Sequence, residues 1–296
     1  MIKGVARSFW AVVAVVGAVE VFIGFLAFRS AETDLTCWFS GLRNQGYASA
    51  TCGAHSLIVG FQSWVPAAVI LLLFTATILS GLTTLTTQYV RTEMALRRLG
   101  AQIPNPVALR RIASALRIDV HLCDDDRCFC CCAGFLFPRV IISTAMAQML
   151  DEPQLTAVLA HEAAHVRRRD PARALAVRCA ANALFYLPLV RHLSQRALIA
   201  SELGADSVAA NVAGQAALVR ALLDILGRVR PALGTVTEMA SLGALDSRIE
   251  ALRTRAVPRS RPGALVVLTS SLMLIGLLLL GAWLPHPVHL ILRPAK

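Results

Sequence analysis

Long apolar stretches are the feature that most limits how this chain can fold. The hydrocarbon core of a bilayer is roughly 30 Å thick, and a helix needs about 20 apolar residues to cross it. Three stretches are long enough, namely residues 9–28, 65–82 and 264–284. Hydrophobic residues make up 56% of the chain and the mean hydropathy is +0.61, which is too apolar for an ordinary soluble protein. We therefore expect a membrane protein with three transmembrane helices.

The first apolar stretch follows Lys3 and Arg7, so a cleaved signal peptide is an alternative to a retained anchor. The stretch is longer than the usual signal core of about 7–15 residues, and no clear cleavage site precedes Arg29. A retained anchor is therefore the expected outcome.

The distribution of basic residues predicts how the chain is oriented. Lys and Arg total 29 against 18 Asp and Glu, and they gather after the second apolar stretch and before the third. The positive-inside rule assigns such a region to the cytoplasm. We expect an N-terminal membrane region (1–90) with an exterior loop (29–63), a cytoplasmic domain (91–262), and a C-terminal membrane region with a short exterior tail (263–296). No nucleic-acid-binding pattern is present, so direct binding of DNA or RNA is not expected.

The cytoplasmic region begins with a mixture of helix and strand. Residues 108–116 carry apolar side chains at three- and four-residue steps, which is typical of an amphipathic helix. Residues 118–123 alternate in polarity and residues 139–143 are β-branched, so both are predicted strands. From Asp151 onward the pattern is mainly helical. The predicted fold class is a mainly α membrane protein with a small β-sheet, in which transmembrane helices flank an α+β domain.

A two-histidine motif lies on the helix that Asp151 can cap. His161 and His165 are separated by one helical turn, so both imidazoles lie on one face, with Glu162 beside it. Two neutral imidazoles suit a zinc ion, and a carboxylate that is not a ligand can take a proton from its water. A bare pair of histidines at this spacing also arises by chance, as ordinary polar residues of a helix.

A second acidic pair argues against that chance explanation. Glu202 and Asp206 are again one helical turn apart. Glu202 can complete a tetrahedral site with His161 and His165, leaving one position for water, and Asp206 can accept the outer N–H of a ligand histidine. We therefore predict one Zn²⁺ ion held by these three ligands, with Glu162 as the catalytic residue.

The apolar segment 172–190 lies between the two parts of this site. If it crossed the bilayer completely, Glu202 and His165 would be on opposite sides and one ion could not bind both. The segment must therefore lie at the interface, dip into the membrane and return, or be buried in protein.

Residues 133–143, 155–165, 167–171, 202–206 and 246–252 together resemble the BlaR/MecR-like antirepressor regulatory metallopeptidases, and more distantly the HtpX-type membrane proteases. The resemblance covers about residues 105–255. It implies a gluzincin-type α+β peptidase domain that faces the cytoplasm from a bacterial cytoplasmic membrane. Such an enzyme cuts itself or a cytoplasmic transcriptional repressor during signal transduction.

The resemblance also implies a substrate-binding edge strand, on which an extended protein or peptide substrate pairs by β-augmentation. Membrane lipid is the other expected partner, and a homodimer is left open. The predicted edge strand consists of Arg139, Val140, Ile141, Ile142 and Ser143.

Two other functions compete with the regulatory peptidase. One is an HtpX-like membrane protease that degrades damaged proteins. The other is a signal-transducing membrane scaffold whose zinc site is purely structural. Glu162 separates the last hypothesis from the first two, because a structural site needs no additional carboxylate beside its ligands.

A group of cysteines between the two predicted strands has two interpretations. They can bind a soft metal or sense oxidants, or they can pack as small apolar residues, and their spacing fits no standard zinc site. The group consists of Cys123, Cys128, Cys130, Cys131 and Cys132.

Overall fold

The computed structural model describes residues 50–228 and 262–282, with their side chains over 68–225 and 262–280. It also describes five helical residues near the N-terminus: Ala14, Ala18, Val19, Val21 and Phe25. The rest of the expected first span, residues 29–49 of the expected exterior loop, the stretch 246–252 and the C-terminal tail lie outside the described residues.

Helix α2 is the longest element and runs from Ala50 to Arg97, so it begins within the expected exterior loop. Its part from Ala68 to Arg97, with a mean hydropathy of 2.1, is the one helix of the described residues long and apolar enough to cross a membrane. Only 17% of its most apolar window is buried, unlike the core helix of a soluble protein.

Threonines interrupt the apolar surface of α2, but their hydroxyls bond within the helix itself. Each donates to the carbonyl oxygen four residues earlier, an arrangement that leaves no unsatisfied hydroxyl donor facing hydrocarbon. The threonines concerned are Thr75, Thr77, Thr83, Thr84, Thr86 and Thr87. The helix is therefore compatible with lipid despite this polar composition.

Helix α11, Ala264–Ala282, corresponds to the expected third span. Its apolar part, Ala264–Leu280, is shorter than a full candidate span. Of the three expected transmembrane helices, the described residues thus support the second.

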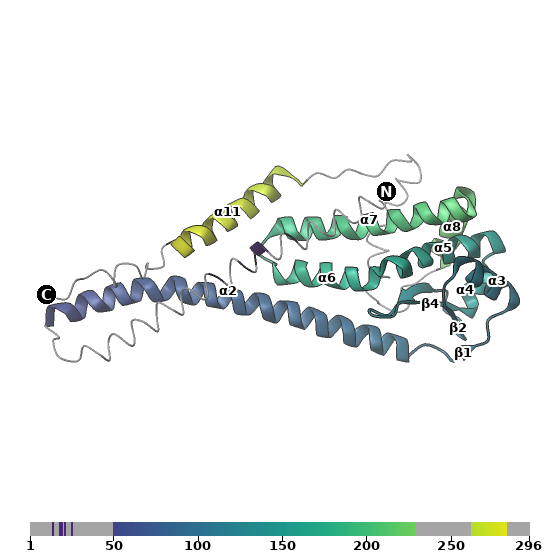
Figure 1. Cartoon of the computed structure of the whole chain (residues 1–296), viewed down its shortest axis with the longest axis horizontal. Helices are drawn as coiled ribbons and strands as arrows, with labels where there is room; N and C mark the ends of the chain where they lie inside the picture. The colour runs from purple at the N-terminus through teal and green to yellow at the C-terminus, as the bar shows by residue number, and fades with distance from the viewer. Residues whose placement is uncertain are drawn as a thin grey trace.

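A four-stranded sheet lies beyond the C-terminal end of α2 (Figure 1). Its strands are β1 (Gln102–Ile103), β2 (Val120–Cys123), β3 (Cys130–Ala133) and β4 (Arg139–Ser143), in the order β1-β2-β4-β3. The β2–β4 pair is parallel, and the other two pairs are antiparallel. Both predicted strands are confirmed, as is the helix predicted over 108–116, which is α3 (Val107–Leu116).

The prediction that residues 139–143 form an edge strand is wrong. Strand β4 pairs with β2 on one side, where Val140 is opposite Val120, and with β3 on the other, where Val140 is opposite Cys132. The reason is topological. Because β2 and β4 pair in parallel, the intervening strand β3 folds back as a hairpin onto the outer side of β4 and occupies the edge itself.

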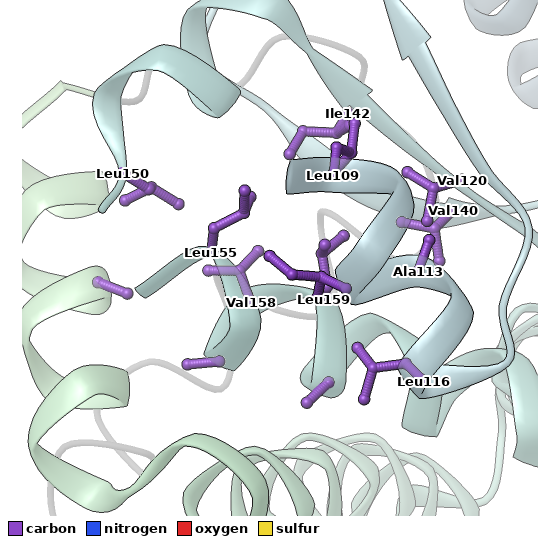
Figure 2. Packing of buried hydrophobic residues seen from close by; sticks show 14 of the residues in the cluster. Leu109, Ala113, Leu116, Val120, Val140, Ile142, Leu150, Leu155, Val158 and Leu159 are labelled. Atoms are coloured by element: carbon purple, nitrogen blue, oxygen red, sulfur yellow. The ribbon is translucent and has the colours of Figure 1, made fainter. Parts of the chain in front are cut away.

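The two faces of the sheet have different covers. On one face, α3 and α5 (Glu152–Arg168) pack against the sheet, and Figure 2 shows their apolar side chains meeting there. On the other face, Leu96 and Leu99, at the end of α2 and just beyond it, pack against Cys123, Cys131 and Ile141. The sheet is therefore held between α5, which carries the two-histidine motif, and the C-terminal end of α2. The short helix α4 (Thr144–Met149) follows β4 directly.

Helices α6 (Asp170–Ala183) and α7 (Pro188–Ala213) form a hairpin, and α8 (Gln215–Arg228) follows. Figure 1 shows α6 and α7 side by side, with α6 next to α2. The Asn182 amide donates to Thr84 Oγ1 at 3.0 Å, and Ser80 Oγ donates to the Asn182 carbonyl at 2.8 Å. The chain thus turns back at residues 184–187, which keeps α5 and the later part of α7 at the same end of the molecule.

The tip of this hairpin is buried between helices. Leu184, Leu187 and Val190 are covered by Phe74 of α2 and Leu274 of α11, among others. The segment 172–190 therefore consists of most of α6, the turn and the start of α7, and its tip is buried in protein, which is one of the arrangements that the sequence left open.

Candidate metal centre

Two histidines and a glutamate from separate helices converge at one buried point. His161 and His165 lie on α5, and Glu202 lies on α7. The two imidazole Nε2 atoms are 3.1 Å apart, and each lies 3.6 Å from a carboxylate oxygen of Glu202. His165 and Glu202 are only 2% and 3% exposed. This is the one group of three potential ligands that converges in this way within the described residues.

The local sequence explains why α5 presents the motif. Asp151 caps the helix through the Gln154 backbone N–H, and the Gln154 side chain in turn accepts from the Asp151 backbone N–H. This reciprocal capping box fixes the start of the helix two turns and more before His161. At the other end, Arg169 adopts the left-handed conformation with φ 54°, which ends α5 and starts α6.

Each histidine is held from behind by an aspartate. His161 Nδ1 lies 2.9 Å from Asp206 Oδ1, and His165 Nδ1 lies 2.8 Å from Asp170 Oδ2. When Nδ1 donates its proton to a carboxylate, Nε2 keeps its lone pair for a metal ion. Both rings are thereby oriented with their Nε2 atoms toward Glu202.

This donor set fits a zinc ion. Bonds of about 2.0–2.1 Å in a tetrahedron separate neighbouring ligand atoms by about 3.3 Å. The two Nε2 atoms, 3.1 Å apart, and the distances of 3.6 Å from His161 Nε2 to Glu202 Oε2 and from His165 Nε2 to Glu202 Oε1 are close to that value. Two imidazole lone pairs this close repel each other unless a cation or a proton lies between them. His161, His165 and Glu202 are therefore the residues that would hold the ion.

Asp170 has a part in the site that the sequence did not reveal. Its Oδ2 atom also accepts from Ser201 Oγ at 2.7 Å and from Arg168 Nε at 2.9 Å, and Arg168 donates to the Ser201 carbonyl at 3.0 Å. Burial alone raises the pKa of Asp170, but the hydrogen bond and charge of His165, the charge of Arg168 and the hydrogen bond from Ser201 outweigh it and lower that pKa. Asp170 thus joins α5, α6 and the turn of α7 that carries Glu202.

Glu162 is 8% exposed and lies on α5, which contacts β3. Burial raises the pKa of both the Cys130 and the Cys132 thiol, and the nearby negative charge of Glu162 adds to the effect. The Glu162 carboxylate therefore lies near β3.

The cysteines do not form a metal site in the described part of the chain. Cys130 packs on the α5 face of the sheet, whereas Cys123 and Cys131 pack on the opposite face. Strand alternation sends neighbouring side chains to opposite faces, so these thiols cannot converge on one ion. These cysteines pack on both sides of a thin sheet.

Comparison with known proteins agrees with this geometry. Residues 124–230 match the model of peptidase family M48, and the matched range contains all the histidines and carboxylates of the centre. The match supports a metallopeptidase domain here, and metallopeptidases of this family typically use zinc. No curated protein matched the chain.

Proposed function

We propose that this protein is a membrane-embedded zinc endopeptidase of the bacterial cytoplasmic membrane. The observation that carries the proposal is the convergence of His161, His165 and Glu202 in a buried centre beside a further carboxylate, Glu162. A structural zinc site has no need of that carboxylate. The match to peptidase family M48 over the same residues is independent support.

The chemistry assigned to the chain follows from these positions. A bound zinc ion would polarise the scissile carbonyl and acidify the attacking water. Glu162 accepts the proton that this water loses as its oxygen bonds to the carbonyl carbon. Glu162 then gives that proton to the leaving amine as the C–N bond breaks. Asp170 and Asp206 keep the two imidazoles oriented throughout.

Strand β3 replaces β4 as the proposed substrate-binding edge. Because the Phe129 carbonyl accepts from Ser143 N at 3.0 Å, alternation directs the backbone N–H and C=O of the next residue, Cys130, away from β4. An extended peptide that pairs with this edge passes close to Glu162. The substrate is thus a protein or peptide segment in extended conformation.

The membrane arrangement rests on α2. The segment Ala68–Arg97 is the proposed span, and Arg91, Arg97 and Arg98 at its C-terminal end favour a cytoplasmic catalytic domain (91–262) by the positive-inside rule. Asn182 packs on Ser80 and Thr84, within the uncharged part of α2. The tip of the α6–α7 hairpin is therefore proposed to enter the bilayer, together with the further spans 9–28 and 264–284.

The regulatory role is the most specific part of the proposal. Its support is the resemblance of residues 105–255 to BlaR/MecR-like antirepressors, which points to cleavage of the chain itself or of a transcriptional repressor. Cells that carry Glu162→Ala should lack the specific fragments that wild-type cells contain. Loss of one repressor fragment supports the regulatory role, whereas loss of a broad set of fragments supports quality control.

The enzymatic assignment is tested on purified protein in detergent. Glu162→Ala should retain about one zinc ion per chain while cleavage falls by about 10²–10⁴-fold, as expected for loss of a general base. Glu93→Ala is the matched control, because Glu93 is a carboxylate outside the centre that pairs with Arg97. Zinc content is measured by metal analysis. Unchanged cleavage by Glu162→Ala would show that the cleavage does not depend on this centre, and would overturn the enzymatic assignment.

A further inference from the structure

The turn that joins β3 to β4 exposes two large apolar side chains. Leu136 and Phe137 are 78% and 85% exposed, more than any apolar side chain of the adjoining strands. The turn has a defined conformation, because Gly134 adopts a φ of 99° and a Cβ atom there would lie 2.6 Å from the Phe137 carbonyl oxygen. The turn therefore presents this apolar pair in a fixed way.

A ring contact fixes the level of this turn along α2. The ring of Phe135 stacks on that of Tyr89, with centroids 6.3 Å apart. Tyr89 lies two residues before Arg91, the first charged residue after the uncharged part of α2. Tyrosine favours this kind of position, where a span reaches the surface of the bilayer.

Exposed arginines begin at the same level, where the uncharged part of α2 ends. Arg91 is the first charged residue after the uncharged part of α2, and it is exposed. Arg139, which follows the turn at the start of β4, is exposed as well. Such arginines complement anionic lipid headgroups at the cytoplasmic surface. Close to Tyr89 in the sequence of α2, the apolar side chains of Leu85 and Val90 are also exposed, at 44% and 48%.

We propose that Leu136 and Phe137 insert into the cytoplasmic interface of a bilayer that contains anionic lipid. The proposal rests on the proposed function in one respect, namely that α2 spans the membrane. The turn then forms a second membrane contact, beside the helix, for the catalytic domain.

This contact has a direct consequence for the substrate edge. Strand β3 ends at Ala133, immediately before the turn, so an inserted turn holds the edge strand and the neighbouring Glu162 at a fixed short distance from the lipid. Substrate segments that emerge from the membrane or lie along its surface would reach this edge most easily. The site would select substrates by their position relative to the bilayer.

The test is photo-cross-linking of the full chain in vesicles of equimolar phosphatidylcholine and phosphatidylglycerol. The photoreactive residue p-benzoylphenylalanine replaces Phe137 in one variant. Val107, which is 74% exposed at the start of α3, is the matched surface control, and Leu79, which is 60% exposed on α2, reports on the span itself. Mass spectrometry then detects peptides that carry phospholipid.

The expected result is lipid attachment at positions 137 and 79 and at least tenfold less at position 107. Attachment at 79 but not at 137 overturns this inference while leaving α2 as a span. No attachment at either position removes the membrane assignment as well. Equal attachment at 137 and 107, or attachment of 137 to protein in place of lipid, also overturns the inference, because the turn then has no preference for the bilayer.

Discussion

His161 and His165 are held by aspartates that come from different parts of the fold. Asp206 lies on α7, one turn after Glu202, so a single helical segment carries both a ligand and the partner of another ligand. Asp170 begins α6 and binds His165, Arg168 and Ser201 together. The first aspartate therefore holds a ligand histidine, and the second holds a ligand histidine and also joins three helices.

This difference predicts separable effects of two conservative substitutions. Asp206→Asn and Asp170→Asn should each weaken zinc binding by about 10–100-fold, because each loses the carboxylate that orients a ligand histidine. Only Asp170→Asn should also destabilise the metal-free protein, by about 3 kcal/mol, because it leaves the buried guanidinium of Arg168 without its charged partner.

Chelator competition measures the zinc affinity, and chemical unfolding in chelator measures the stability without metal. Asp224→Asn serves as the control, since this carboxylate bonds Gln154 away from the centre. Equal stability of the two metal-free variants would contradict the joining role of Asp170.

The sequence revealed Asp206 but not Asp170, and backbone geometry explains the difference. Asp206 follows Glu202 at a regular helical spacing, which a pattern can predict. Asp170 reaches back to His165 only because Arg169 adopts a left-handed conformation and turns the chain between α5 and α6. A single non-glycine residue with positive φ leaves no recognisable pattern in one sequence.

At the scale of elements, strand formation was predictable and strand order was not. Alternation and β-branching identified β2 and β4, and the capping residues identified α5. The pairing of β4 on both sides depends on how β3 folds back, and β3 consists largely of cysteines, which carry little strand signal. The hairpin tip, with its conformationally restricted glycine, sets the geometry of the β3–β4 pair, and the edge is decided by which of these two strands pairs with β2.

Two glycines allow this role of the turn to be tested. Gly134 and Gly214 both have positive φ, at 99° and 89°, so a side chain is strained at either position. An added Cβ meets the Phe137 carbonyl at position 134 and nothing within 4 Å at position 214. Gly134→Ala should therefore lower the free energy of unfolding by about 2–3 kcal/mol, against about 1 kcal/mol for Gly214→Ala. Thermal unfolding in detergent compares them, and equal losses would show that the turn can relax.

The substrate edge can be tested on Cys130. Proline there removes a backbone N–H that points away from β4, so the sheet should tolerate it at the start of an edge strand. Cys130→Pro should lower kcat/KM by about tenfold, mainly through KM, because a peptide substrate loses one backbone hydrogen bond. Cys130→Ala, which keeps the N–H, controls for the lost thiol. Peptide cleavage assays measure both, and matching values would remove β3 as the binding edge.

For the molecule as a whole, the metal centre lies where its two principal helices meet. Helices α5 and α7 pack along each other, and each supplies ligands to the same point. The α6–α7 hairpin makes this possible, because it extends along α2 and returns before Glu202. An ion at this point therefore links α5 to the part of α7 that returns from the α6–α7 turn. Because these ligands come together only in the folded protein, the ion binds only the folded state.

Bound zinc should therefore raise the stability of the whole folded domain, in addition to supporting its activity. A ligand that binds only the folded state stabilises it by about 4 kcal/mol when its free concentration is about 1,000 times Kd. Chelator should therefore lower the Tm of the wild type by several degrees. The same shift is expected for Glu162→Ala, which keeps all three ligands, and no shift for His165→Ala, which lacks one. Differential scanning fluorimetry in detergent measures these shifts. A chelator effect that persists in His165→Ala would mean that the stabilising ion binds elsewhere, because a site built from these three side chains cannot survive loss of the imidazole that Asp170 holds in place.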